Sequence, residues 1–368
     1  MSTLRDEIIE LIRLEGPITV EHYMGLCLGH PTKGYYTTRD PFGADGDFIT
    51  APEISQMFGE LIGLWAAQVW INMGEPEKFR LIELGPGRGT LMADALRAAG
   101  QAEGFLKAAR LHLVEASAKL RAEQRNTLPV LPHKPEWHGL FSDVPGGPAI
   151  IVANEFFDAL PIRQFLRRQG QWHECLAGIG KDGSLAFGLS GAAAKDIARA
   201  APDGDVLEIC PAGLELARDI GARLAAEKGA ALIIDYGYPG KRNQPTLQAL
   251  RAHSYAPILE NPGEADLTAH VDFSALAAAA RSGGAAVFPP VTQAALLDRL
   301  GLDARADKLK QNADTAQQAE IEAARARLTD LSEGGMGRLF KALTIASPGM
   351  IPPPGFDWDD PLMEKFSA

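Results

Sequence analysis

A carboxylate and three glycines follow one another in the segment 79–90. An apolar run ends in Glu83, and Gly85, Gly87 and Gly89 occupy alternate positions before a helix-forming stretch. This order predicts a strand, a tight turn and a helix, which is how an open α/β sheet builds a nucleotide site. Glycine lets the backbone turn sharply and approach a ligand without an intervening Cβ atom. The acid at the strand end can accept hydrogen bonds or meet a cationic amine.

The glycine spacing indicates which ligand to expect. A dinucleotide site carries Gly-x-Gly-x-x-Gly, whereas here Gly89 comes one position earlier and Thr90 stands in the place of the third glycine. The resulting Glu-x-Gly-x-Gly-x-Gly pattern is typical of sites for S-adenosyl-L-methionine, which has an ammonium group and no phosphate. Two alternatives stay open, a glycine-rich turn without a ligand and a nicotinamide-dependent enzyme, and Thr90 disfavours the latter.

A second acid ends the next apolar run, 110–116. If this run is the neighbouring parallel strand, Glu115 lies beside the glycine turn, where its two oxygens can accept from both ribose hydroxyls. The alternative is a carboxylate that caps a helix or faces solvent. The βαβ spacing from Glu83 favours the cofactor role.

Three polar residues follow the predicted strand at 148–153. Asn154, Glu155 and Asp158 therefore belong at the carboxyl ends of the strands, where ligands of open α/β sheets bind. We predict that a methyl acceptor meets the cofactor there. The structural alternative is that Asn154 and Asp158 only cap the following turn.

Other polar residues are weaker candidates. Thr50 and Glu53 belong to the segment 46–55, which is predicted to fold over the cofactor as a lid, although Pro52 can also simply begin a helix. Further candidates for substrate contact are Tyr35, Asp235 and His270.

Methyl transfer from a sulfonium is an in-line displacement, so an enzyme mainly aligns donor and acceptor and keeps water out. Clustered carboxylates suit a cationic acceptor. A guanidinium group is planar and pairs bidentately with carboxylates. Glu155 and Asp158 could hold such a group, direct a nitrogen lone pair to the methyl carbon and accept the released proton.

The composition limits the possible classes of protein. The 368 residues carry 36 Lys and Arg against 47 Asp and Glu, a net charge of −11, which argues against a general nucleic-acid binder. Three isolated cysteines, without a CxxC pair, predict a reducing compartment and no zinc site. The first residues are too polar for a signal peptide and too acidic for a transit peptide. No window of about 18 apolar residues exists, so membrane insertion is not expected, and the chain is predicted to be cytoplasmic.

The elements that must position these residues follow from periodicity. We predict an α/β fold with a mostly parallel sheet, helices on both faces and an inserted antiparallel meander at 163–210 that returns through 206–209. The expected parallel strands are 79–84, 110–115, 136–141, 148–153 and 230–236. Helices are expected at 2–15, 18–28, 54–73, 211–228, 272–282, 292–300 and 303–330, strands near 285–289 and 338–346, and a loop at 237–266. Asp272 is a candidate N-cap.

The predicted organisation has three parts. Residues 1–75 form a helical and lid region, 76–347 form the methyltransferase core with insertions at about 163–210 and 237–266, and 348–368 form a tail.

Five sequence blocks together resemble the MidA family, whose mitochondrial members are arginine methyltransferases that assist the assembly of respiratory complex I. The similarity runs from about residue 5 to residue 345. The blocks are Glu83–Thr90, Asn154–Pro161, Gly46–Ser55, Asp235–Tyr238 and Asp266–Phe273.

The resemblance implies a Rossmann-like class I methyltransferase fold that uses S-adenosyl-L-methionine. It also implies symmetric dimethylation of an arginine on the 49-kDa-type quinone-oxidoreductase subunit. Mitochondrial members carry a targeting presequence, whereas this chain starts at its first helix, which suggests a bacterial member. Two alternatives remain, an assembly chaperone that only holds the cofactor and a small-molecule methyltransferase, and a homodimer stays open.

Overall fold

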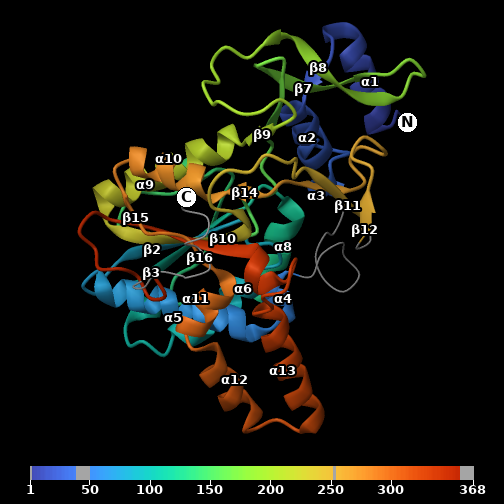
Figure 1. Cartoon of the computed structure of the whole chain (residues 1–368). Helices are drawn as coiled ribbons and strands as arrows, with labels where there is room; N and C mark the ends of the chain where they lie inside the picture. The colour runs from blue at the N-terminus through green and yellow to red at the C-terminus, as the bar shows by residue number, and fades with distance from the viewer. Residues whose placement is uncertain (1, 39–49, 252–253, 357–368) are drawn as a thin grey trace. The chain divides into compact units, whose positions relative to one another are not determined.

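The computed structural model describes residues 2–38, 50–251 and 254–356. The chain forms two compact units, each assembled from segments that are far apart in the sequence (Figure 1). The first unit contains residues 1–48, 158–213 and 241–270, and the second contains 49–157, 214–240 and 271–368. Each unit has its own hydrophobic core.

The second unit is built on a mostly parallel sheet, as predicted. Its strands run in the order β15–β17–β10–β5–β2–β3–β4, with β14 beside β10 and β16 beside β17. The neighbours from β10 to β4 are parallel, whereas β17 is antiparallel to β10. The bounds are β2 Phe79–Leu84, β3 Ala109–Val114, β4 Glu136–His138, β5 Ala149–Asn154, β10 Gly229–Tyr238, β14 Val271–Asp272, β15 Ala286–Val287, β16 Val291–Thr292 and β17 Phe340–Ala346.

Helices cover both faces of this sheet (Figure 1). On one face, Leu81, Leu111 and Ile150 are register partners on three adjacent strands and share a core with α5 and α6. These two helices can pack closely because Gly63 has no side chain. A Cβ atom at this position would lie 2.2 Å from the Ala95 carbonyl oxygen. The helices α9 and α10 lie on the other face (Figure 1). The bounds are α4 Ala51–Ile54, α5 Gln56–Asn72, α6 Thr90–Ala99, α7 Phe105–Ala108, α8 Ala118–Thr127, η1 Phe141–Asp143, α9 Pro211–Glu227, α10 Phe273–Ser282, α11 Gln293–Arg299 and α14 Met336–Leu339.

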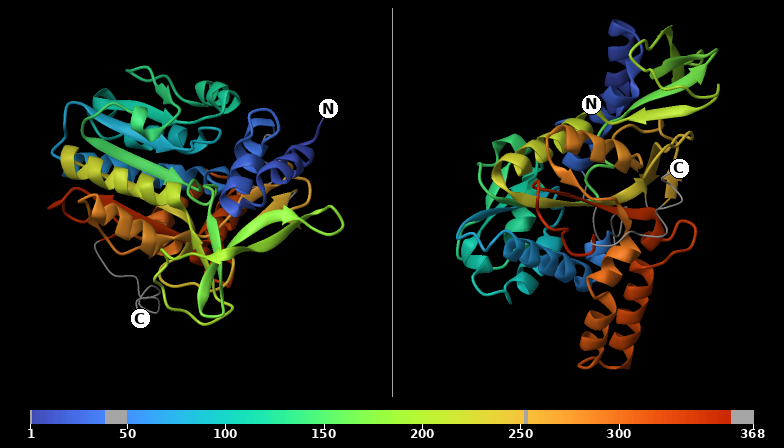
Figure 2. Two further views of the ribbon diagram at one scale, coloured as in Figure 1. Left: turned by 90° about the horizontal axis from the view of Figure 1, so that it is seen from above. Right: turned by 60° about the vertical axis from the view of Figure 1, so that its left-hand side comes forward.

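The single helix predicted for 303–330 is wrong, because the chain forms two helices there. α12 covers Leu302–Lys310 and α13 covers Thr315–Leu328, and they lie side by side (Figure 2, right). Asp314 is the physical reason for the break, since its side chain accepts from the backbone N–H of Gln317 and the Gln317 side chain accepts from Asp314. This reciprocal capping begins a new helix.

The first unit joins the N-terminal helices to antiparallel strands. One sheet has the order β1–β7–β6–β9 with β8 beside β7, which confirms the predicted meander and its return strand. The 237–266 segment is not only a loop, because it contains two strands, β11 and β12. They form a second sheet with β13 in the order β12–β11–β13, in which β11 pairs with both neighbours. The bounds are α1 Leu4–Glu15, β1 Ile18–Thr19, α2 Val20–Gly29, α3 Tyr35–Thr38, β6 Arg163–Arg168, β7 Gln171–Ile179, β8 Leu185–Ala193, β9 Val206–Ile209, β11 Gln248–Arg251, β12 Ser254–Ala256 and β13 Asp266–Thr268.

The helices of the described ranges are all too short or too polar to cross a membrane.

Candidate functional site

The glycine turn joins β2 to α6, as the spacing predicts. Gly85, Gly87 and Gly89 have φ angles of 61°, 53° and 84°, a region that residues with a Cβ atom rarely adopt. A Cβ atom at Gly85 would also lie 2.7 Å from Cδ2 of Phe156. The Gly85 N–H donates to the Val114 carbonyl at 3.0 Å, which fixes the turn to the neighbouring strand. Because these glycines have no Cβ atom, a ligand can approach the backbone of this turn closely.

Glu83 is a buried acid at the end of β2. The residue is 2 % exposed, and its Oε2 atom has no hydrogen-bond partner among the described residues. Burial, with a further contribution from the negative charge of Glu115, raises the pKa of Glu83 to about 8. An unsatisfied buried carboxylate oxygen is costly unless a cation or donor meets it. The residue thus fits the ammonium group of S-adenosyl-L-methionine.

Glu115 follows β3 and lies beside the glycine turn. One carboxylate oxygen accepts from the Ser117 N–H at 2.7 Å, and the other accepts from Nε2 of Gln124 at 3.3 Å. The same Gln124 nitrogen donates to the Gly87 carbonyl at 2.7 Å. Burial raises the pKa of Glu115, while these hydrogen bonds act in the opposite direction. The carboxylate is held in a fixed orientation, as recognition of two ribose hydroxyls requires.

The short helix α4 is tied to the same site. Thr90 donates from its hydroxyl to Oε1 of Glu53 at 2.9 Å. The Ala51 N–H donates to Oε1 of Glu155 at 3.3 Å. Thr50 is the N-cap residue of this helix, although its side chain makes no capping hydrogen bond. Residues 46–49 of the predicted lid lie outside the described residues.

β5 ends at Asn154, and the turn after it begins with Glu155 in a strained conformation. Glu155 has a φ angle of 49°, which is unusual for a residue with a side chain. The Asn154 amide nitrogen donates to Oε1 of Glu155 at 3.2 Å, and Oδ1 of Asn154 is buried without a hydrogen-bond partner in the described part of the chain. Strained backbone and unsatisfied polar atoms are features of functional sites.

Asp235 supports this turn from the neighbouring strand β10. Its Oδ2 atom accepts from the N–H groups of Phe156 and Phe157, and its Oδ1 atom accepts from the N–H of Tyr236. The residue is fully buried. This anchoring of the backbone is a role that sequence reasoning, which placed Asp235 among substrate contacts, did not foresee.

The remaining candidates belong to the first unit. Asp158 is 7 % exposed, and its carbonyl accepts from the Ala269 N–H at 3.0 Å. Tyr35 is fully buried with its ring edge-on to Tyr36. His270 donates its backbone N–H to the Thr246 hydroxyl at 2.9 Å.

Near these residues, Tyr36 donates to Oδ1 of Asp266 at 3.0 Å. Burial and the charges of Asp266 and Asp158 raise the pKa of Tyr36 well above its ordinary value. Half-buried Tyr36 and the buried acids Asp158 and Asp266 therefore form an acidic cluster within the first unit. Asp158 follows Glu155 by three positions, yet the two fall on either side of the division between the units.

Two further features contain none of the predicted site residues. His112, Glu136 and His138 bring possible metal-ligand atoms within 4.8 Å of one another. However, burial, His138 and the cations Arg80 and Arg223 lower the pKa of His112 to about 4. Nδ1 of His112 and Nε2 of His138 already share a hydrogen bond at 3.0 Å, and we assign no metal to this cluster.

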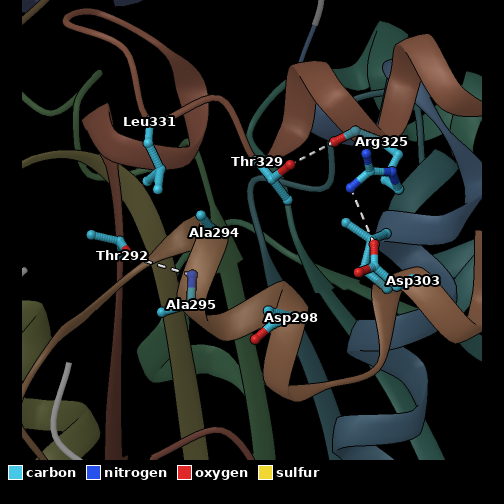
Figure 3. A pocket seen from close by; sticks show the side chains of 9 residues that line it. Thr292, Ala294, Ala295, Asp298, Asp303, Arg325, Thr329 and Leu331 are labelled. Atoms are coloured by element: carbon cyan, nitrogen blue, oxygen red, sulfur yellow. Dashed lines mark hydrogen bonds and ion pairs between the residues drawn. The ribbon is translucent and has the colours of Figure 1, made fainter. Parts of the chain in front are cut away.

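A pocket of about 330 Å³ opens between α11, α12 and α13 (Figure 3). On its wall, Arg325 donates to Asp303 at 3.2 Å. It contains none of the residues predicted to bind the cofactor, and we assign no ligand to it. The lining residues are Thr292, Ala294, Ala295, Asp298, Leu302, Asp303, Arg325, Thr329 and Leu331.

Comparison with known proteins gives consistent matches. Residues 61–291 match a family described as "Putative S-adenosyl-L-methionine-dependent methyltransferase". The chain is 40 % identical to the mitochondrial protein arginine methyltransferase NDUFAF7 of Mus musculus over 80 % of this chain and 73 % of that protein. It is 37 % identical to the Drosophila melanogaster homologue, over 91 % of this chain and 83 % of the relative.

A solved structure agrees with these relatives. A Burkholderia thailandensis protein crystallised with S-adenosyl-homocysteine superposes with a TM-score of 0.82 at 30 % identity, covering 96 % of this chain and 93 % of that one.

Proposed function

The chain belongs to the MidA family of S-adenosyl-L-methionine-dependent methyltransferases, and from this premise we propose that it methylates an arginine side chain of a protein. That it is a methyltransferase and uses this cofactor follows from the family. The arginine acceptor is supported by relatives named as protein arginine methyltransferases that span most of the chain. The more specific assignments concern residues and the protein substrate.

The cofactor supplies an electrophilic methyl group on a sulfonium. Glu83 would pair with the ammonium group of the cofactor, and Glu115 would accept from the ribose hydroxyls. The backbone of the turn at Gly85 and Gly87 would approach the cofactor closely. Glu53, with Thr50 at the start of α4, borders the same turn through its hydrogen bond with Thr90. The unsatisfied oxygen of buried Glu83 is the observation that supports this assignment most strongly.

Asn154 and Glu155 are proposed to hold the acceptor, and Asp158 is proposed to complete the acidic group. A guanidinium is charged at neutral pH, so one nitrogen must lose a proton as it gains the methyl group. The Glu155 carboxylate would orient the planar group and accept that proton, while the buried Asn154 carbonyl oxygen would accept from a second nitrogen. The fixed, strained Glu155 turn supports this role because preorganised groups lower the cost of alignment.

The proposed protein substrate is an arginine of the 49-kDa-type subunit of a quinone oxidoreductase, which would become symmetrically dimethylated. Methylation keeps the positive charge but blocks bidentate hydrogen bonding, so it can change how that subunit packs during assembly. The proposed location is the bacterial cytoplasm, whereas the named animal relatives are mitochondrial.

Incubation of the full chain with the cognate 49-kDa-type subunit and methyl-labelled S-adenosyl-L-methionine tests this function. We expect label in the subunit, mapped by mass spectrometry to one arginine and lost when that arginine becomes lysine. Label in small molecules alone would support a small-molecule methyltransferase. Capture of the subunit without methyl transfer, equal in the Glu155→Ala variant, would favour an assembly chaperone and overturn the proposal.

A further inference from the structure

Gln124 is the buried polar residue of helix α8, whose other polar side chains are at least partly exposed. Helix α8 is only partly covered, and Leu120 and Gln124 are its buried residues. Gln124 is fully buried, and its Cγ atom lies 3.4 Å from the position that a Cβ atom of Gly89 would take. The side chain therefore packs directly under the glycine turn.

Three hydrogen bonds use both ends of this amide. Its Nε2 atom donates to the Gly87 carbonyl at 2.7 Å and to Oε2 of Glu115 at 3.3 Å. Its Oε1 atom accepts from the indole Nε1 of Trp137 at 2.8 Å. Trp137 lies on β4, so one side chain connects the glycine turn, the acid after β3 and the edge strand.

Trp137 determines which way the amide faces. An indole N–H only donates, so the glutamine oxygen must face it and the NH₂ group must face the opposite side. There the two acceptors are the Gly87 carbonyl and the Glu115 carboxylate. The Arg125 guanidinium lies 4.7 Å above the Trp137 ring, which adds a cation–π contact that holds the indole in place.

We propose that Gln124, oriented by Trp137, is a positioning residue that fixes the Glu115 carboxylate and the Gly87 carbonyl for the ribose end of the cofactor. This inference rests on the proposed cofactor role of Glu115. The Ser117 N–H holds one carboxylate oxygen and Gln124 holds the other. Loss of Gln124 leaves the carboxylate held at one oxygen only, by the Ser117 N–H, so it can pivot about that contact and meets the ribose hydroxyls in a less favourable orientation.

The test is calorimetric titration of the full chain with S-adenosyl-homocysteine and with its analogue that lacks both ribose hydroxyls. Gln124→Leu keeps the approximate volume and removes the hydrogen bonds. We expect it to weaken S-adenosyl-homocysteine binding about tenfold or more, the usual order for a lost hydrogen bond to a charged group. The dissociation constant of the analogue should change by no more than about twofold. Trp137→Phe keeps the ring under Arg125 and should give a smaller loss in the same direction. Exposed Gln101→Leu is the matched control.

The outcomes separate this inference from the function on which it rests. Equal weakening of both ligands by Gln124→Leu would indicate a general structural role and overturn the positioning role, as would unchanged binding of both. Glu115→Gln tests the cofactor assignment itself. If that variant binds S-adenosyl-homocysteine like the original chain, Glu115 does not bind the ribose and the proposed site is wrong.

Discussion

Asp235 holds Phe157 in place by accepting its backbone N–H at 3.0 Å. The same oxygen accepts from Phe156, so one buried carboxylate anchors the turn that begins with Asn154 and Glu155. Strand β10 is parallel to β5, and Ile234 pairs with Asn154 at the end of β5. Asp235 directly follows Ile234 in β10. The strained conformation of Glu155 therefore depends on a residue that is 80 positions away in the sequence.

Replacement of Asp235 by alanine should destabilise the protein and impair catalysis more than cofactor binding. The change leaves three backbone N–H groups without their acceptor, and we expect about 2–4 kcal/mol of lost stability from unsatisfied donors. Urea denaturation measures the stability, and calorimetry with S-adenosyl-homocysteine measures binding. Asp272→Ala is a useful control, because this carboxylate caps α10 by accepting from the Ala275 N–H. A loss in Asp235→Ala no larger than the loss of a single helix cap would contradict the anchoring role.

Replacement of Gly85 by alanine should abolish tight cofactor binding with a modest loss of stability. The φ angle of 61° is strained for alanine, and the new methyl group would lie 2.7 Å from Phe156. The backbone cost is about 1–2 kcal/mol, and the phenyl ring or the turn must move as well. Thermal unfolding and S-adenosyl-homocysteine titration measure the two effects. Gly188→Ala, in β8 where a Cβ atom meets open space, should change neither, and equal behaviour of the two variants would refute the argument.

The pKa of about 8 for Glu83 predicts how stability depends on pH. In the folded, ligand-free protein Glu83 keeps its proton up to about pH 8, whereas the unfolded chain releases it near its ordinary pKa of 4.5. This stabilising contribution is thus complete below pH 4.5 and is lost as the pH rises to 8. The loss amounts to at most ~1.4 kcal/mol per pH unit. Urea denaturation between pH 5 and 8.5 should give a flatter profile for Glu83→Gln than for the original chain.

The same group couples cofactor binding to proton release. Pairing with an ammonium requires the ionised carboxylate, so at pH 7 binding should expel about one proton and tighten as the pH approaches 8. Titration of S-adenosyl-homocysteine in buffers of different ionisation enthalpy counts that proton. Glu83→Gln should bind weakly and release none. Proton release that persists in this variant would assign the effect to another group.

The sequence predicted the elements whose signals are local. A continuous apolar run followed by alternate glycines predicts β2, the turn and α6, because backbone conformation there is set by the residues themselves. Continuous apolar runs also predicted the parallel strands, whereas their order in the sheet was not predicted. The break between α12 and α13 also had a local signal, the Asp314 and Gln317 pair of a capping box, which the alanine-rich composition of the region concealed.

Roles that depend on distant contacts were beyond such reasoning. Gln124 lies in a helix of polar residues and acquires its partners only when α8 packs against the glycine turn and β4. Asp235 lies near the end of a strand, where ligand-binding residues are expected. However, the segment after the neighbouring strand brings the backbone N–H groups of Phe156 and Phe157 to its carboxylate. The residue type was informative in both cases, whereas the partner was determined by tertiary packing.

Glu155→Gln should separate chemistry from binding. A glutamine oxygen can still accept hydrogen bonds from Ala51 and Asn154, so the turn should persist. The neutral amide cannot take up the proton that the methylated arginine releases. We expect S-adenosyl-homocysteine binding to stay within about threefold and kcat on the arginine substrate to fall about 10²–10³-fold, the range for loss of a general base. Exposed Glu260→Gln is the matched control. An unchanged kcat in Glu155→Gln would remove this residue from the chemistry and leave Asp158 as the acid to test next.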